Sequence, residues 1–212
     1  MASKDIFDQR AREAIEFGFE LPTVEFKGAG PFEPLKFRIA RAAQGLSNHR
    51  DGGLIIIGVR QEKGKIVERQ GVTDVVEHSY DHETIYEFVN SYASPAIELR
   101  ISIVEVEEQR FVAISIPPFH RTPTICRKDT PAAVGDNERM KAGDVFIRPL
   151  DKICTRKVQT AEEMDELIQR SVERRASELL RVLLASGRID EALRAVEKSR
   201  FEKEVEDIEK YL

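Results

Sequence analysis

Three glutamates in the first third of the chain have the types and spacing that metal-assisted chemistry needs. Glu20 and Glu25 are five residues apart across the start of an extended segment, and Glu62 follows the most apolar short run of the chain. If the segment and the run are neighbouring strands, the three carboxylates converge at one end of a sheet. Carboxylate oxygens suit Mg²⁺ or Mn²⁺, and such an ion activates water against a phosphodiester. Solvated surface acids would give the same pattern.

Lys27 adds a cation to this set. It lies two residues after Glu25 and therefore on the same side of an extended chain. A lysine beside a carboxylate can stabilise a phosphate or a leaving oxyanion, although any exposed strand face looks similar. The candidate catalytic residues are Glu20, Glu25, Lys27 and Glu62, with Glu20 and Glu25 as metal ligands.

The elements that would position these residues predict an α/β (α+β) fold, a mixed β-sheet with flanking helices and a C-terminal helical hairpin. The run Leu54–Val59 is bounded by glycines and predicts a strand buried on both faces, in the middle of the sheet. Helical spacing predicts helices over 5–17, 33–48, 81–93, from 160 to about 187, and over 189–212. Alternation and turn residues predict extended segments at 20–27, 66–67, 97–106, 111–116, 124–127 and 144–148. We place an α/β domain at 5–158 and a charged helical tail, for docking or oligomerisation, at 159–212.

The glycine pair before the apolar run does not form a nucleotide-binding loop. Asp51-Gly52-Gly53 lacks a following Lys-Ser or Lys-Thr, and the glycines precede a strand instead of opening a helix. This excludes nucleotide hydrolysis on that motif. The pair predicts either a tight turn or a place where another backbone or a ligand approaches closely.

Composition narrows the class of protein. The 212 residues include no apolar run near the ~20 residues that span a bilayer, and the first five residues lack the apolar core of a signal peptide. We therefore expect a cytoplasmic protein without a membrane partner. Cys126 and Cys154 have no metal-ligand spacing and are expected to be free thiols.

Charge is unevenly distributed along the chain. Residues 120–158 hold nine basic and five acidic residues, a net charge of +4 on a chain whose total is -5. A basic segment on an acidic chain indicates a phosphate-binding face, with an ordinary solvated loop as the alternative. The candidate nucleic-acid contacts are Lys27, Arg121, Arg127, Lys128, Arg148 and Lys152.

Several short motifs, taken in order, resemble the Schlafen AlbA-type domain. The first group comprises Glu20, Val24-Glu25-Phe26-Lys27, Leu46-Ser47-Asn48, Gly52-Gly53 and Ile57-Gly58-Val59. The second comprises Ile116-Pro117-Pro118, Pro123 and Val145-Phe146-Ile147-Arg148. The likeness spans about residues 20–158, and the C-terminal helices lie outside it.

The resemblance implies an α/β fold with a mixed sheet and binding of DNA or RNA, as a regulator or defence component. Some Schlafen members are metal-dependent ribonucleases that use two glutamates and an aspartate. The glutamates match Glu20 and Glu25, but Arg60-Gln61-Glu62 stands where the aspartate is expected, so Glu62 would replace it only after a one-residue shift. The alternatives to a binding domain are thus a Mg²⁺- or Mn²⁺-dependent ribonuclease and a sensor module that forms a homo-oligomer through its C-terminal helices.

Overall fold

The computed structural model describes the chain except residues 1, 19–20, 63, 136–137, 150–153 and 187–212. The chain divides into two compact units, residues 1–168 and residues 169–212. The helices are α1 (Ala2–Phe17), α2 (Phe32–Ser47), α3 (Asp74–His78), α4 (His82–Tyr92) and α5 (Ala161–Ala185). The strands are β1 (Val24–Lys27), β2 (Gly53–Ile57), β3 (Val59–Glu62), β4 (Lys65–Arg69), β5 (Ala93–Ser94), β6 (Arg100–Val106), β7 (Gln109–Ile116), β8 (Ile125–Cys126), β9 (Phe146–Ile147) and β10 (Arg156–Lys157).

The main sheet is mixed, as the sequence predicted. Its strand order is β1-β2-β7-β6, with β1 parallel to β2 and the other neighbours antiparallel. All five residues of β2 are buried, and the strand lies in the interior of the sheet. The predicted strand over 54–59 is nevertheless two strands. Gly58 has a φ of +105°, which breaks the extended backbone, and β3 leaves to pair with β4 in a separate hairpin.

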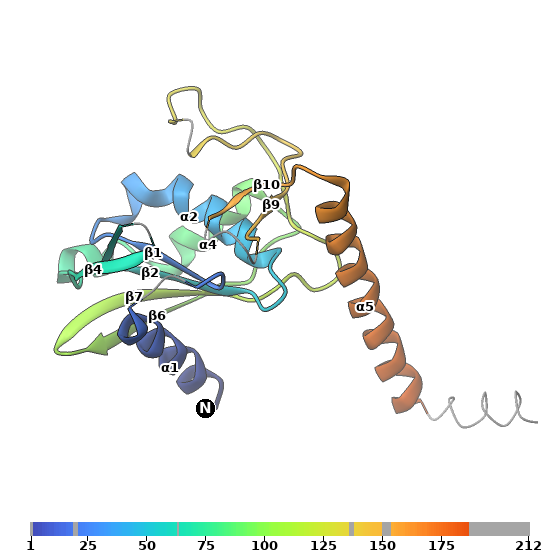
Figure 1. Cartoon of the computed structure of the whole chain (residues 1–212), viewed down its shortest axis with the longest axis horizontal. Coiled ribbons are helices and arrows are strands. Elements are labelled where there is room, and N and C mark those ends of the chain that lie inside the picture. Colours follow the sequence, from blue (N-terminus) through green and yellow to red (C-terminus); the bar gives the residue numbers. More distant parts are fainter. Residues whose placement is uncertain (1, 19–20, 63, 136–137, 150–153, 187–212) are drawn as a thin grey trace, which may run out of the picture. The chain divides into compact units, whose positions relative to one another are not determined.

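Helices cover the two faces of this sheet (Figure 1). One face packs Ile55 and Ile57 of β2 against α2 and α4, in a core that also includes Ile39 and Ile85. The other face packs the alternate β2 residues, Leu54 and Ile56, against Ala11, Ala14 and Ile15 of α1. Because successive side chains of a strand point to opposite faces, a single apolar strand serves both cores.

The glycine pair at the start of β2, Gly52 and Gly53, meets backbone on two sides. A Cβ on Gly52, whose φ is +67°, would lie 2.3 Å from the carbonyl oxygen of Ile116. A Cβ on Gly53 would lie 2.3 Å from the carbonyl oxygen of Thr23. Of the two predicted roles, the close approach of backbone is therefore confirmed, and any side chain larger than hydrogen would push β1 or β7 away from β2.

Asn48, at the end of α2, ties three segments together. Its side-chain amide donates to the carbonyl oxygens of Thr124 at 2.8 Å and Phe146 at 2.9 Å, and its side-chain oxygen accepts from the Thr124 N–H at 2.7 Å. The side chain is buried, so these bonds replace water on all three backbone groups. Asn48 thereby fixes the segments around β8 and β9 against the end of α2.

The start of α5 is attached to the first unit. The Thr160 hydroxyl accepts from the Glu163 N–H at 3.3 Å, a capping contact at the start of the helix. Glu163 also forms an ion pair with Arg156, and this hydrogen-bonded pair lowers the pKa of Glu163 to about 2. Leu167 is buried with Phe119 and Ile147. These contacts hold the first turns of α5 against the segments around β9 and β10, and the domain boundary at Val158 stays a prediction.

Other expectations have mixed outcomes. The helices predicted at 5–17, 33–48 and 81–93 are confirmed as α1, α2 and α4, whereas the short α3 was not predicted. The segments expected to be extended from 20 and 97 become strands only at Val24 and Arg100. The second helix of the predicted hairpin, 189–212, lies outside the described residues. Both thiols are free, Cys126 buried and Cys154 exposed, as expected.

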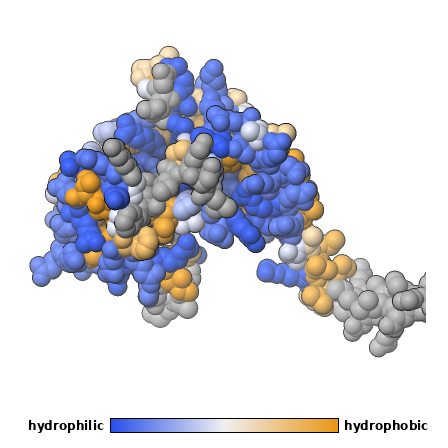
Figure 2. Space-filling model, in the orientation of Figure 1, coloured by the Kyte–Doolittle hydropathy of each residue, from blue (hydrophilic) through white to orange (hydrophobic). Residues whose placement is uncertain are grey.

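The later part of α5 carries exposed apolar side chains. They are Ile168, Val172, Leu179, Leu180, Val182 and Leu184. Figure 2 shows apolar residues near the end of this helix, whereas the visible face of the first unit is mostly hydrophilic. Across the described residues, no helix is both long and apolar enough to cross a membrane. Self-association through the C-terminal helices stays a prediction.

Candidate functional site

The predicted catalytic pair, Glu25 and Lys27, lies on the edge strand β1. In the parallel register these residues stand beside Ile55 and Ile57 of β2, whose side chains belong to the core under α2. Phe26, between them, points to the α1 side and is buried there. The alternation of β1 therefore places both charged side chains on one face of the sheet, as predicted, and this is the face that packs against α2.

Glu25 is the centre of a largely buried charge cluster. Its carboxylate forms ion pairs with Lys27 and with Arg148, although the Glu25 side chain is only 14% exposed and the Arg148 side chain 0%. Burial raises the pKa of Glu25, but the two cations and their hydrogen bonds more than offset it, so the net pKa lies below its usual range. Glu25 is therefore a fixed anion that holds two cations.

Arg148 takes a structural position instead of the predicted phosphate contact. Its guanidinium also donates to the carbonyl oxygens of Pro22 and Val24, each at 2.8 Å. These bonds join the segment after β9 to the start of β1, which is 124 residues away from Arg148 along the chain. Because the side chain is enclosed by protein, a phosphate cannot reach it without opening this packing.

A third cation near this cluster was not predicted. Arg41 of α2 donates to the carbonyl oxygen of Thr155 at 2.9 Å, and its guanidinium lies 5.3 Å from the ring centroid of Phe146. Burial lowers the pKa of Arg41, while Cys154, Glu25 and Asp144 act in the opposite direction. In the sequence, Arg41 lies outside the apolar positions of α2, and this was the signal that could have singled it out. The spacing of those positions does not show which side chains Arg41 contacts.

The predicted metal ligands are only partly described. Glu20 lies outside the described residues, as does the predicted nucleic-acid contact Lys152. Glu62, at the end of β3, is 67% exposed and lies 3.6 Å from Arg60. The β3–β4 pairing has an irregular register between Arg60 and Gln61, the kind of shift that Glu62 needs to replace an aspartate.

The surroundings of Glu25 do not fit a divalent cation. Two protein cations already neutralise its carboxylate, and Mg²⁺ or Mn²⁺ would have to displace them. Among the residues with described positions, no three His, Cys, Asp or Glu side chains form a group that could hold a metal. We derive no metal-dependent step, and the ribonuclease alternative stays a prediction.

The acid dependence of stability should report this cluster. A Glu25 pKa below its ordinary 4.5 means that its charge stabilises the fold above that value, and that this contribution is lost as pH falls through the lower folded pKa. We expect the free energy of unfolding to decline from about pH 5 downward. Urea denaturation at a series of pH values measures this. The free energy of unfolding of Glu25→Gln should depend less on pH than that of the wild type. Glu62→Gln, at an exposed carboxylate, should keep the wild-type slope, and an equal slope for Glu25→Gln would contradict this assignment.

The remaining predicted cations lie on the surface of the basic segment. Arg127 and Lys128 are exposed directly after β8, which pairs with β5, and Arg121 is exposed in the preceding loop. The Arg127 N–H donates to the carbonyl oxygen of Tyr92 at 2.8 Å, and the Lys128 ammonium lies 4.5 Å from the Tyr92 ring centroid. The structure therefore divides the predicted contacts into a buried group, Lys27 with Arg148, and an exposed group.

The exposed group belongs to a loop whose two arms are hydrogen-bonded to each other. The Thr130 N–H donates to Met140 O at 3.0 Å, and the Gly143 N–H donates to Cys126 O at 2.8 Å. We call residues 126–144 the basic loop; it projects at the top of Figure 1 in yellow. Its exposed basic residues are Arg127, Lys128, Arg139 and Lys141.

Three acids of the basic loop whose positions are described have partners within the protein. Asp129 accepts from the Ala142 N–H at 2.8 Å, and Asp144 accepts from the Lys141 N–H at 2.7 Å. Glu138 forms an ion pair with Arg38 of α2. The described carboxylates thus shape and anchor the loop, while its basic side chains remain at the surface.

Comparisons with known proteins find a family and two similar solved structures. No curated protein matches the chain. The DIP2311 protein from Corynebacterium diphtheriae has 16% identity and a TM-score of 0.44, over 68% of this chain and 23% of that one. The N-terminal domain of a RecG-related putative ATP-dependent DNA helicase from Nitrosomonas europaea has 16% identity and a TM-score of 0.36, over 52% of this chain and 72% of that one. The family described as "Schlafen, AlbA_2" matches residues 20–153, most of the chain, and as the motifs predicted, the chain belongs to that family.

Proposed function

We propose that this chain binds DNA or RNA and that the basic loop contacts the phosphates. Membership of the Schlafen AlbA_2 family supports a function related to nucleic acids. The main support is that the basic and the acidic side chains of the loop have different surroundings. Arg127, Lys128, Arg139 and Lys141 are exposed. Of the described acids, Glu138 and Asp144 are half-buried and bound to protein groups, and the exposed Asp129 accepts from a backbone N–H of the loop.

This difference matters because the whole chain is acidic. With a net charge of -5, long-range attraction to a polyanion is weak, and binding must depend on a local cationic surface. Neutralising phosphates with Arg and Lys releases counterions, which makes such binding steeply dependent on salt. The hydrogen bonds across the basic loop keep its two arms, and therefore their cations, side by side.

Charge reversal in the basic loop tests this. Arg127→Glu with Lys128→Glu should weaken binding of single-stranded RNA and DNA by about tenfold or more at low salt. The plot of log K against log[salt] should also become shallower by about 1.4. Each phosphate contact on a single strand contributes about 0.7 to the steepness, and the variant loses two contacts. Fluorescence anisotropy with labelled 20-mers over a salt series measures both quantities.

The matched control is Arg12→Glu with Lys65→Glu. Both residues are exposed, on α1 and β4, and the pair changes the net charge by the same amount. It should leave the affinity and the salt slope near wild type. Equal losses in both double variants would mean that only net charge matters, and no loss in the loop variant would refute the proposed contact.

A further inference from the structure

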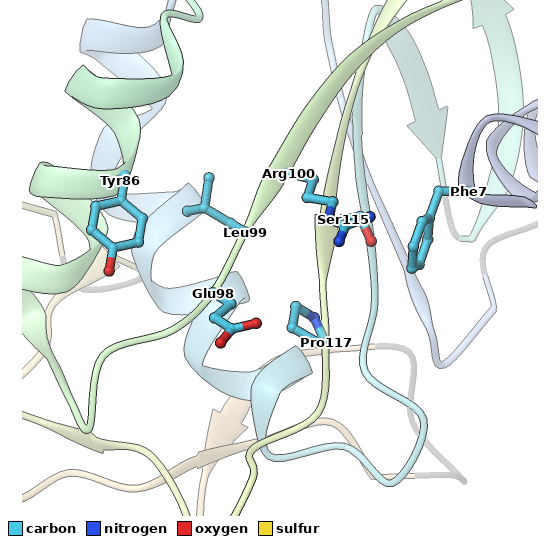
Figure 3. A pocket seen from close by; sticks show the side chains of 7 residues that line it. All are labelled: Phe7, Tyr86, Glu98, Leu99, Arg100, Ser115 and Pro117. Carbon is cyan, nitrogen blue, oxygen red and sulfur yellow. The ribbon is translucent and has the colours of Figure 1, made fainter. Parts of the chain in front are cut away.

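A pocket of about 340 Å³ opens beside the edge strand β6, away from the basic loop. It is lined by Phe7 of α1, Tyr86 of α4, Glu98, Leu99, Arg100, Ser115 and Pro117 (Figure 3). Ser115 pairs with Arg100 and Leu54 across the sheet, so its side chain lies on the α1 face. The volume is at the lower end of the range for small-molecule sites.

Besides Arg100, one buried and two exposed polar side chains line this pocket. Ser115 is only 6% exposed, yet its hydroxyl makes no side-chain hydrogen bond to any residue that the structure describes. The carboxylate of Glu98 and the hydroxyl of Tyr86 likewise have no partner within the described chain. Ser115 is buried, whereas Glu98 and Tyr86 are exposed at the rim, so a bound molecule can reach all three groups. Because buried polar groups are normally hydrogen-bonded, the Ser115 hydroxyl beside these two groups indicates a polar-edged ligand.

The walls and the charge of the pocket restrict that ligand further. The rings of Tyr86 and Phe7 stand on opposite sides of the view, with Glu98 and Ser115 between them (Figure 3). The Arg100 guanidinium lies 5.7 Å from the Phe7 ring centroid, and His82 stacks on Tyr86 at 6.0 Å with an interplanar angle of 15°. The Glu98 carboxylate and the Arg100 guanidinium together give the pocket no net charge, and the carboxylate repels anions. A flat, neutral, heteroaromatic ligand fits better than a phosphate.

We propose that this pocket takes one unstacked nucleobase, with guanine preferred. The adjacent N1–H and N2–H groups of guanine can donate to both oxygens of Glu98, and its O6 can accept from Arg100 or Ser115. The base ring packs against Tyr86. Single-stranded nucleic acids are recognised by such stacking combined with hydrogen bonds to base edges. This inference rests on the proposed function and adds a base-reading site to the phosphate contacts.

Nucleotide titration of the full chain tests the pocket directly. Amide shifts are followed by ¹⁵N–¹H NMR during addition of each of the four nucleoside 5′-monophosphates, with inorganic phosphate as the reference. We expect guanosine monophosphate to shift the amides of Tyr86, Glu98, Arg100 and Ser115, and inorganic phosphate to leave them unchanged. Glu98→Gln should weaken guanosine monophosphate by about 10–100-fold, because the bidentate acceptor is lost.

Two further variants keep the test independent of folding. Tyr86→Leu alters an exposed ring and should also weaken binding, while Glu87→Gln, on the same helix but outside the pocket, should bind as wild type. The inference is overturned if no nucleotide shifts the pocket amides, if Glu98→Gln binds guanosine monophosphate as wild type, or if inorganic phosphate gives the same shifts. If the pocket binds no nucleotide but the basic loop still binds nucleic acid, the pocket inference fails and the proposed function stands.

Discussion

Arg148→Met should lower the free energy of unfolding by about 3–5 kcal/mol. The guanidinium is fully enclosed and is bound by the Glu25 carboxylate and by the carbonyl oxygens of Pro22 and Val24. Its removal leaves a largely buried carboxylate with Lys27 alone, and leaves two carbonyl groups without their donor. Since domains are stable by only about 5–15 kcal/mol, urea denaturation will show this as a large fall in the transition midpoint.

Arg127→Met provides the matched comparison. This arginine is exposed in the basic loop, and its replacement should change the free energy of unfolding by less than about 0.5 kcal/mol. The two variants should behave oppositely in binding. Folded Arg148→Met should bind single-stranded RNA like wild type, whereas Arg127→Met should bind it more weakly. A stable Arg148→Met that has lost RNA affinity would return Arg148 to the phosphate contacts.

Asn48→Ala should be the second severely destabilising change, by about 3 kcal/mol or more. It removes three hydrogen bonds at once and leaves Thr124 N–H, Thr124 O and Phe146 O buried without their side-chain partner. A neighbouring polar residue gives the scale, because Ser47 makes a single side-chain bond, to Thr124 at 3.1 Å. Ser47→Ala should therefore cost about 1 kcal/mol.

Thermal denaturation followed by circular dichroism ranks these two variants. Hydrogen exchange adds a local readout, because loss of the Asn48 side chain frees the segments around β8 and β9 from α2. Amides around Cys126 and Phe146 should exchange faster in Asn48→Ala than in the wild type. The amides of β2 should keep their wild-type protection. An effect of Asn48→Ala no larger than that of Ser47→Ala would contradict the three-segment role.

The parts of the fold that the sequence predicted depend on local periodicity. Leu54 to Ile57 are apolar and β-branched between glycines, and the β6–β7 alternation is interrupted only at Glu107 and Glu108, which adopt the left-handed turn conformation. Such patterns follow from neighbouring residues alone. Gly58 was harder to interpret, because a glycine within an apolar run does not show whether the strand continues or turns away.

The candidate site was less predictable because its contacts join distant segments. Arginine is almost never fully buried unless it is paired, so the sequence alone favours an exposed Arg148, and its partner Glu25 lies 123 residues away. The same holds for the basic loop. Nothing in the spacing of Asp129, Glu138 and Asp144 shows that protein groups hold them, and the proposed phosphate contact depends on that arrangement.

The most direct test of the account is a map of the amides that respond to nucleic acid. A ¹⁵N–¹H NMR titration of the full chain with a single-stranded RNA 20-mer identifies the contact surface without any substitution. We predict that the largest shifts fall within residues 126–144, foremost at Arg127, Lys128 and Lys141, with little change at Glu25 or Lys27. Shifts centred on the Glu25 cluster, with the basic loop unaffected, would contradict the account.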